Sequence, residues 1–494
     1  MACTTILVGK NASYDGSTMV ARNDDSGSGH FTAKKFVVVQ PEEHPAVYRS
    51  VISHVEVPLP GHALRMTAMP NAVEGEGIWA AAGVNAAHVG MTATETITSN
   101  PRVLGADPLV VYQPAKGERP EVPGGIGEED IVCLVLPYIR SAREGVVRLG
   151  ELLRTYGTYE MNGIAFQDVN EIWWLETIGG HHWMARRVPD ESYVVMPNQL
   201  GIDSFDFADA CGAQENYMCS DDLKAFVDKY HLDLSLDGSF NPRDAFGSHD
   251  DADHVYNTPR AWFMLRHLNP NTWVWEGPDA DYTPHSDDLP WCMVPERKIT
   301  PEDVKYLLSS HYQGTPYDPY AAYGDPKSKG DYRTIGINRN SFMALTQMRP
   351  DLPEEFRTVE WIAYASNAFN TMVPFYANVD TTPAYLACTT GEVSTESFYW
   401  VSRMIAAMAD AAYGKSIFHV ERYEEGVLSA TRALLNAYDE KQAQEADPAR
   451  RAALRTEANE AIARELKARA ADTLNKVLFE LSCNMKNAFS RSDA

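Results

Sequence analysis

Residues 3–25 read CTTILVGKNASYDGSTMVARNDD, and the interpretation of the whole chain starts from this stretch. Thr4–Gly9 and Ser17–Ala21 are short runs of β-branched and small residues, which favour β-strands. The Asp15-Gly16 pair between them is a typical turn signal. The sequence therefore predicts a β-hairpin whose facing positions sum to roughly 26 or 27. In that register, residue 3 lies opposite residues 23 and 24.

The hairpin would bring a reactive side chain next to charged ones, because Cys3 lies beside the Arg22-Asn23-Asp24-Asp25 segment. A guanidinium near a thiol lowers the pKa of that thiol and stabilises the nucleophilic thiolate. A carboxylate in the same cluster can orient the arginine or an amino group. A thiol near a chain end can also be an accident of sequence, but this combination favours a nucleophile.

The base that fits such a nucleophile is the α-amino group of Cys3 itself. Its ordinary pKa of about 7.7–8.0 is close to working pH, which suits general base catalysis. That amine is free only if Met1 and Ala2 are removed, so we expect residues 1–2 to be a propeptide. We expect the Ala2–Cys3 bond to be cleaved autocatalytically, which gives an N-terminal nucleophile arrangement.

Composition and charge narrow the function classes. The 494 residues include 43 Lys and Arg against 68 Asp and Glu, a formal net charge of −25. This balance argues against nucleic acid and anionic membranes as partners, because both require clustered cations. The seven cysteines form no CxxC pair, which fits a reducing compartment. With no secretory signal and no apolar run beyond Ile131–Ile139, we expect a cytoplasmic protein.

Motifs for other chemistries are absent or weak. The chain has no HExxH, CxxC or GxSxG, and His181-His182 lacks the spacing that one helix face requires. Gly75–Ala80 resembles a GxGxxA fingerprint without a clear preceding strand, so a glycine turn is favoured over dinucleotide binding. We therefore expect no metal and no organic cofactor. The cysteines outside residue 3 are expected to be small buried hydrophobes: Cys133, Cys211, Cys219, Cys292, Cys388 and Cys483.

The rest of the chain alternates between strand and helix patterns, which predicts a layered α+β fold. Helical spacing of apolar residues covers Glu128–Tyr156, and residues 200–335 are rich in loops and aromatic residues. Asp447-Pro448 is a helix start signal, followed by a long amphipathic helix suited to packing on the body or on a second subunit. Further predicted strands are Phe36–Val39, Gly77–Ala82, Val89–Thr94, Gly163–Gln167, Ile172–Thr177 and Ser192–Met196.

Taken together, the motifs resemble the PepD-type dipeptidases, cysteine N-terminal nucleophile hydrolases related to penicillin V acylases and bile salt hydrolases. Besides the segments of the hairpin, the resemblance rests on Ala82–Asn85, Met91–Thr96, Asp107–Leu109, Glu128–Asp130, Leu136–Tyr138, Ala142–Gly145, Met196–Gln199 and Tyr256–Arg260. It implies a four-layer αββα sandwich over residues 3–400, with loop-rich insertions around 200–335 and a helical C-terminal region at 401–494.

The resemblance also implies roles for single residues. Cys3 matches the nucleophile, and Arg22 and Asp25 match the pair that adjusts the thiol and holds the amine. Asn198 matches an oxyanion donor, and Arg260 matches a late active-site arginine. Where the acylase relatives have a second oxyanion asparagine, this chain has Thr94-Glu95-Thr96. Thr94 and Glu95 are expected to bind substrate, Glu95 through a substrate ammonium unless it forms a structural ion pair.

The expected function is hydrolysis of dipeptides of broad specificity through a Cys3 acyl-enzyme, without a cofactor. Two alternatives remain open from the sequence. The same cluster could cleave a non-peptide amide of the penicillin V or bile salt type, or the protein could be a catalytically silent binding homologue. A small peptide is the expected partner, and a homo-oligomer is expected from the long terminal helix.

Overall fold

The computed structural model describes residues 3–487, apart from the side chain of Thr94. Its first element is the predicted hairpin, formed by β1 (Thr4–Val8) and β2 (Thr18–Asp25). The register pairs Thr4 with Asn23 and Val8 with Met19, so facing positions sum to 27 and the prediction is confirmed. Gly16 has φ of 79° in the connecting turn, a conformation that favours glycine.

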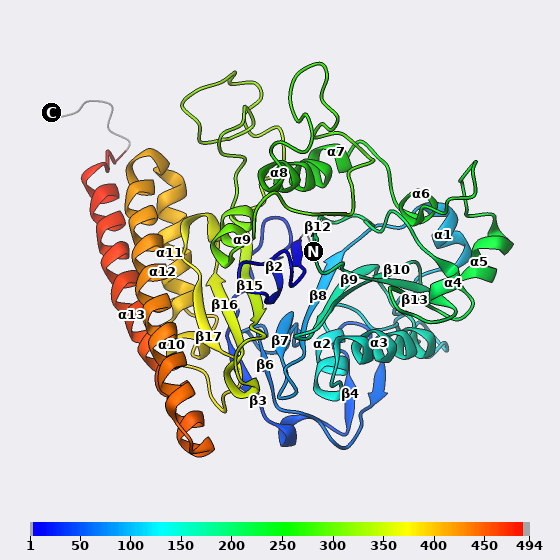
Figure 1. Ribbon diagram of the computed structural model, residues 1–494, viewed down its shortest axis with the longest axis horizontal. Helices are drawn as coiled ribbons and strands as arrows, with labels where there is room; N and C mark the ends of the chain where they lie inside the picture. The colour runs from blue at the N-terminus through cyan, green and yellow to red at the C-terminus, as the bar shows by residue number, and fades with distance from the viewer. Residues whose placement is uncertain (1–2, 488–494) are drawn as a thin grey trace.

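Two antiparallel sheets form the body of the molecule (Figure 1). The first has seven strands in the order β14-β12-β1-β2-β15-β16-β17, and the second has six in the order β13-β11-β10-β9-β8-β7. β1 is therefore an interior strand, paired with β2 on one side and β12 on the other. The remaining strands of the first sheet are β12 (Tyr193–Met196), β14 (Cys292–Met293), β15 (Asn340–Met348), β16 (Thr358–Tyr364) and β17 (Val373–Tyr376). The second sheet consists of β7 (Ala82–Val84), β8 (Gly90–Thr96), β9 (Asn162–Gln167), β10 (Ile172–Thr177), β11 (Trp183–Arg187) and β13 (Tyr217–Cys219).

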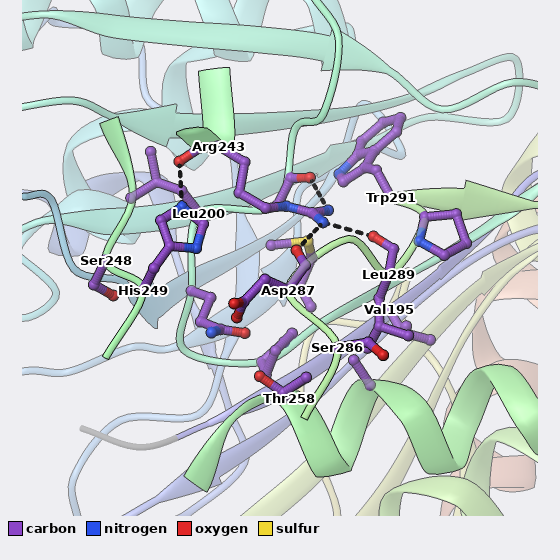
Figure 2. A pocket seen from close by; sticks show the side chains of 16 residues that line it. Val195, Leu200, Arg243, Ser248, His249, Thr258, Ser286, Asp287, Leu289 and Trp291 are labelled. Carbon is purple, nitrogen blue, oxygen red and sulfur yellow. Dashed lines mark hydrogen bonds between the residues drawn. The ribbon is translucent and has the colours of Figure 1, made fainter. Parts of the chain in front are cut away.

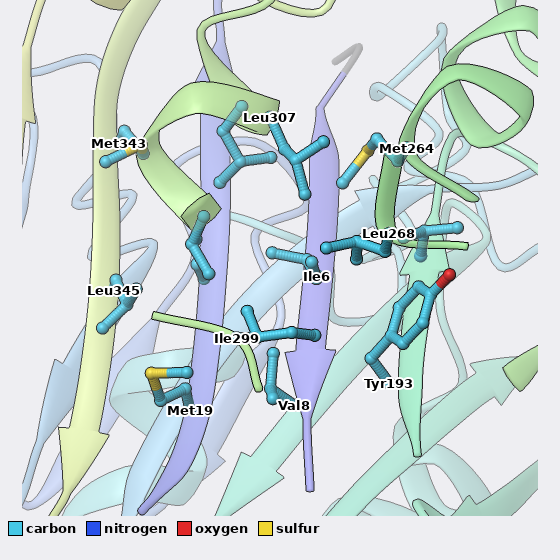
Figure 3. Close-up of a cluster of buried hydrophobic side chains, with 14 of the residues drawn as sticks. Ile6, Val8, Met19, Tyr193, Met264, Leu268, Ile299, Leu307, Met343 and Leu345 are labelled. Atoms are coloured by element: carbon cyan, nitrogen blue, oxygen red, sulfur yellow. The ribbon is translucent and has the colours of Figure 1, made fainter. Parts of the chain in front are cut away.

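The two sheets pack against each other through apolar side chains. Leu7 and Val20 of the first sheet belong to one buried cluster with Ala165 and Trp174 of the second. Because side chains alternate along a strand, Ile6 and Val8 point to the opposite face of β1. There they pack with Met264 of α8 (Thr258–Leu268) and Leu307 of α9 (Pro301–Leu308), as Figure 3 shows. On the second sheet, α2 (Ile131–Val135) and α3 (Ala142–Tyr156) cover the face that carries Ile164 and Phe166. The mixture of helices and sheets confirms the α+β class.

Three C-terminal helices lie along the β16–β17 end of the first sheet (Figure 1). They are α11 (Phe398–Ala411), α12 (Tyr413–Gln444) and α13 (Pro448–Cys483). The Asp447 side chain accepts hydrogen bonds at the start of α13, and Pro448 is its first residue, as predicted. Ile462 and Leu466 share a buried cluster with Ile362 and Phe375 of the sheet, so these helices are part of the central core.

The predicted loop-rich stretch around 200–335 contains short elements joined by long connections. These are α4 (Phe207–Ala210), α5 (Leu223–Tyr230), α6 (Pro242–Phe246), α7 (Asp253–Tyr256), α8, α9, β13 and β14. Elsewhere, the smaller elements are β3 (Val37–Val39), β4 (Val47–Arg49), β5 (Glu56–Pro58), β6 (Met66–Ala68), α1 (Pro101–Ala106) and α10 (Ala384–Ala387). Within residues 3–487, none of the helices combines the length and the apolar character that crossing a bilayer requires.

Three predictions about local structure are wrong. The predicted strand Gly77–Ala82 is a strand only from Ala82 onward, because Trp79 and Ala81 have φ of 49° and 57°. The predicted helix at Glu128–Tyr156 is interrupted by a 3-10 turn at Leu136–Tyr138, where Pro137 removes a backbone donor. Cys211, Cys388 and Cys483 are exposed rather than buried, and Cys292 is only partly buried.

Candidate active site

Cys3 comes directly before β1, and the pleat of the strand decides which groups meet its sulfur. Residues that face each other across an antiparallel pair point to the same side of the sheet. Thr5 faces Arg22, and Thr5, Leu7 and Cys3 alternate onto the side that faces the second sheet. The Cys3 thiol therefore lies between the two sheets with Arg22. Both residues are fully buried, with 0% of the surface of each exposed.

The Arg22 guanidinium is the closest charged group to the Cys3 sulfur. Its Nη2 donates to Cys3 Sγ at 2.9 Å, to Glu128 Oε1 at 2.6 Å and to Asp24 Oδ1 at 3.1 Å. Its Nη1 donates to the carbonyl of Ala93 at 2.8 Å. With a longer contact from Nη1 to the carbonyl of Ala81 at 3.4 Å, five contacts from two nitrogens hold the guanidinium in one orientation against the sulfur.

This environment keeps the Cys3 thiol neutral. Burial raises the pKa of the thiol far above its usual range, and Arg22 lowers it by less than burial raises it. The carboxylates of Glu95, Glu128 and Asp24 raise the pKa further. Arg22 lowers the pKa of the thiol, as expected from the sequence, but burial and the carboxylates around the same guanidinium raise it by more. Removing the thiol proton requires a base.

Cys3, Asp24 and Glu128 are close enough to be considered as metal ligands. Their ligand atoms all lie within 4.8 Å of one another, and they form the one such group among the described residues. Arg22 Nη2, however, donates to all three of these side chains. A guanidinium nitrogen already provides the positive charge that a metal ion would bring.

Arg260 holds the main chain on the other side of Cys3. Its Nη1 donates to the Cys3 carbonyl oxygen and to Thr4 Oγ1, the latter at 2.7 Å. Its Nη2 donates to Asn198 Oδ1 at 2.7 Å and to Asn257 Oδ1 at 2.6 Å. Burial, together with the nearby Arg333, lowers the pKa of Arg260 to about 10. Arg260 thus joins the N-terminal strand to the start of α8 and to the residue that follows β12.

Asn198 is positioned from two directions. It lies just after β12, where Arg260 binds its Oδ1 and its Nδ2 donates to the Thr96 carbonyl oxygen at 2.8 Å. The neighbouring Pro197 and Gln199 line a small cavity of about 30 Å³. Thr258, two residues before Arg260, lines the same cavity (Figure 2). Arg243, which also lines that cavity, donates a hydrogen bond to the Leu289 carbonyl oxygen at 2.6 Å.

Asp25 lies on the other face of β2 from Arg22. Its carboxylate accepts hydrogen bonds from Arg333 Nη2 and from Asn340 Nδ2, the latter at 2.9 Å. Asp24, one position earlier, is the carboxylate on the sulfur side, where it also pairs with Lys34 Nζ at 3.4 Å. The structure thus brings Cys3 and Arg22 together, and separates Asp25 from Arg22 by the alternation of the strand.

Glu95 occupies the second sheet opposite Thr5. It follows an irregularity in the pairing of β8 with β9 and is fully buried, with 0% exposed. Thr5 Oγ1 donates to its Oε2 at 2.7 Å, and its Oε1 has no hydrogen-bond partner among the described residues. Burial raises the pKa of Glu95 to about 8, against the opposing effects of Arg260 and Arg22. The side chain of Thr94 is outside the described part of the chain, as are Met1 and Ala2 of the predicted propeptide.

Sequence reasoning assigned no role to three groups of this cluster: Glu128, Asp24 and Lys34. Glu128 is 106 residues from Arg22, and its side chain arrives from the segment before α2. Lys34 is 1% exposed and donates to the Trp79 carbonyl oxygen at 2.9 Å. The contact of Asp24 with Arg22 could have been found from the hairpin register, because residues two apart in a strand point to the same face.

Comparison with known proteins assigns the family. The model of peptidase family C69 matches residues 2–426. A protein of Bifidobacterium longum (strain NCC 2705) named "Dipeptidase" is 56% identical, with 100% of both chains covered. "Probable dipeptidase A" of Streptococcus pyogenes serotype M3 (strain SSI-1) is 52% identical over 100% of both chains. "Probable dipeptidase B" of Lactococcus lactis subsp. lactis (strain IL1403) is 45% identical over 100% of this chain and 98% of its own. The match to the family model and the full-length similarity to these relatives show that the chain belongs to peptidase family C69.

Proposed function

We propose that the protein is a cysteine dipeptidase that uses Cys3 as its nucleophile. The observation that carries the proposal is the Cys3 sulfur, fixed by Arg22 Nη2 at 2.9 Å at the start of an interior strand. Relatives 45–56% identical over their full length are named as dipeptidases or probable dipeptidases. The substrate is a dipeptide, and the products are two amino acids.

The fold proposed for this function is the four-layer αββα sandwich of the N-terminal nucleophile hydrolases. Two sheets that share an apolar cluster, each with helices on its outer face, support this assignment. In this proposal residues 1–2 are a propeptide, and 3–400 form the catalytic domain with insertions around 200–335. Residues 401–494 form a helical addition to the catalytic domain.

The reaction follows from a neutral thiol beside a freed amine. The α-amine of Cys3 accepts the thiol proton as Sγ bonds to the scissile carbonyl carbon. The carbonyl oxygen becomes a negatively charged oxyanion, towards which Asn198 donates a hydrogen bond. When the C–N bond breaks, the Cys3 ammonium returns its proton to the leaving amine. Water then hydrolyses the thioester, releasing the N-terminal amino acid and restoring the thiol.

The other predicted residues position these groups or contact the substrate. Arg22 orients the sulfur, and Arg260 fixes the Cys3 carbonyl and the Asn198 amide. Asp25 holds the freed amine, because its place on β2 lies across from the position that precedes Cys3 in the hairpin register. In this proposal Thr94 and Glu95 contact the substrate. No step requires a metal or an organic cofactor.

Location and assembly complete the proposal. A peptide-degrading enzyme with reduced cysteines suits the cytoplasm, and we propose a homo-oligomer. Phe418, Phe479 and Met485, which are 50%, 68% and 69% exposed on α12, α13 and just beyond, support an apolar contact between subunits. Light scattering after size exclusion measures the number of subunits directly.

Replacement of the nucleophile tests the proposal. Cys3→Ala should abolish hydrolysis of an L,L-dipeptide, whereas Cys388→Ala, which changes an exposed thiol, should retain the wild-type rate. Intact mass should show loss of residues 1–2 in the wild type and their retention in Cys3→Ala. Dipeptide cleavage should survive exhaustive chelation.

A Cys3→Ala protein that still turns over dipeptide would refute the mechanism. Preferential cleavage of penicillin V or a conjugated bile acid would favour the non-peptide amidase, and a stable, unprocessed wild type would favour the silent homologue.

A further inference from the structure

Glu95 is a buried acid of this site, and the substrate atom that it contacts is still unspecified. In a β-strand, side chains on one face repeat about every 6.6–6.8 Å, so Thr5 is one such step from Cys3. The 2.7 Å hydrogen bond from Thr5 Oγ1 therefore places the Glu95 carboxyl in the compartment next to the sulfur. Glu95 raises the pKa of the Cys3 thiol, as expected for a carboxylate that lies near the sulfur.

The two oxygens of the Glu95 carboxyl differ. Oε2 accepts the Thr5 hydroxyl, whereas Oε1 has no partner among the described residues, although the side chain is 0% exposed. A buried polar atom without a partner costs free energy, so its retention needs a reason. A neutral carboxylic acid has one accepting oxygen and one donating O–H. With Oε2 occupied as acceptor, Oε1 is the oxygen left to carry the proton and donate.

The charges around Glu95 determine what kind of atom it can meet. Arg22 faces it from β2, Arg260 faces it from α8, and Cys3 lies on β1's side of the compartment. Asp25, on the other face of β2, also raises the pKa of Glu95. Three cations of the site, Arg22, Lys34 and Arg333, form ion pairs with three carboxylates, Asp24, Asp25 and Glu128. A fourth cation, Arg260, donates to the amide oxygen of Asn198. With Glu95 neutral, one positive charge is left without a counter-charge. This suits the single negative charge that forms during acyl transfer and disfavours a substrate ammonium.

We propose that Glu95 acts as a neutral carboxylic acid whose Oε1 donates a hydrogen bond to the oxyanion formed when Cys3 attacks the substrate carbonyl. This inference rests on the proposed function and names the second oxyanion donor of that reaction. The pKa of about 8 means that the donating form predominates at neutral pH. As pH rises through that value the proton is lost, and the carboxylate repels both the thiolate and the oxyanion.

Two substitutions separate donation from other roles. Glu95→Gln keeps a donor, because the Thr5 hydroxyl fixes the amide oxygen on its side and directs the NH₂ to the position of Oε1. Glu95→Ala removes the donor. Each variant is prepared with Cys3 as its first residue, released from an N-terminal fusion by a site-specific protease, so that self-processing is not required. Thermal unfolding checks that each variant is folded, and kcat and KM for an L,L-dipeptide are measured from pH 6 to 9.5.

The expected result is a wild-type kcat that falls about tenfold per pH unit above roughly pH 8. Glu95→Ala should lower kcat at pH 7 by about 10²–10³-fold with little change in KM, as for loss of one oxyanion donor. Glu95→Gln should retain kcat within about tenfold and should lose the alkaline decrease. A raised KM with unchanged kcat in Glu95→Gln would overturn the inference in favour of an ammonium site. Unchanged kcat in Glu95→Ala would also overturn it. Absence of Cys3-dependent dipeptide hydrolysis in the wild type would instead refute the proposed function.

Discussion

Alternation of side chains along β2 sorts the acidic residues that surround Cys3. Asp24 is on the sulfur side with Arg22, and Asp25 is on the opposite face with Arg333 and Asn340. The two acids therefore have different partners. Asp24 raises the pKa of the thiol, and Asp25 faces the main-chain side where the freed amine would lie. The resemblance points to Asp25, whereas only the register shows that Asp24 contacts the guanidinium.

Glu128 should control the ionisation of the Cys3 thiol. Its carboxylate raises the pKa of the thiol, so Glu128→Gln should lower that pKa and increase the thiolate fraction at a given pH. The pH dependence of iodoacetamide alkylation at Cys3, followed by peptide mass spectrometry, measures this shift. Glu129→Gln is the matched control, because the Glu129 carboxylate accepts from the backbone nitrogens of Val51 and Ile52 instead. Identical alkylation profiles for Glu128→Gln and the wild type would contradict this assignment.

Among the elements, those defined by local signals were predicted and those defined by distant contacts were not. The hairpin follows from β-branched runs around Asp15-Gly16, and α13 follows from a capping aspartate and apolar spacing. The left-handed backbone at Trp79 and Ala81 has no such signal. The carbonyl oxygens of Trp79 and Ala81 accept hydrogen bonds from Lys34 and Arg22, respectively. Those two side chains approach the carbonyl oxygens only in the folded molecule. For the same reason Glu128 could not be placed on Arg22 from sequence.

Strand β16 contains a buried acid that should make stability depend on pH. Glu360 is 1% exposed, and burial raises its pKa to about 8. The unfolded chain releases this proton near pH 4.5 and the folded protein holds it until about pH 8, so Glu360 lowers the free energy of unfolding as pH rises through this window. Glu360→Gln removes that effect and should be more stable than the wild type at pH 8, by about 1.4 kcal/mol for each unit of pKa shift.

Urea unfolding at pH 5 and pH 8 measures this difference. The increase in the free energy of unfolding caused by Glu360→Gln should be small at pH 5 and larger at pH 8. At pH 8 the wild type must bind a proton at Glu360 in order to fold, whereas the glutamine variant need not. An equal effect of the substitution at both pH values would show that Glu360 titrates as an exposed acid does.

At the scale of the whole molecule, the C-terminal helices are integrated with the sheets. The family match ends at residue 426, within α12, yet residues of α13 lie in the cluster that contains Ile362 and Phe375. The sequence predicted an amphipathic helix here, but its spacing could not distinguish packing on the body from packing on a second subunit. The buried face of α13 packs on the body.

Truncation of a buried leucine in α13 should therefore destabilise the whole protein. Leu466 is fully buried, at 0% exposed, and Leu466→Ala should lower the free energy of unfolding by about 2–5 kcal/mol. Leu478→Ala on the same helix is the control, because that side chain is 51% exposed and should change stability by about 0.5 kcal/mol or less. Urea denaturation followed by tryptophan fluorescence and by dipeptide hydrolysis should report a single shifted transition for Leu466→Ala. A fluorescence transition at a lower urea concentration than the loss of activity would show that the helices unfold independently.

The interior position of β1 determines how rigid a terminus at Cys3 would be and where an affinity tag should not be attached. Chain ends usually fray, yet the strand that follows Cys3 is hydrogen-bonded on both edges, to β12 and to β2. A terminus created at Cys3 would inherit the slow hydrogen exchange of a central strand, so the reactive amine and thiol would be as immobile as the core. The same arrangement makes the N-terminus the wrong place for a permanent affinity tag.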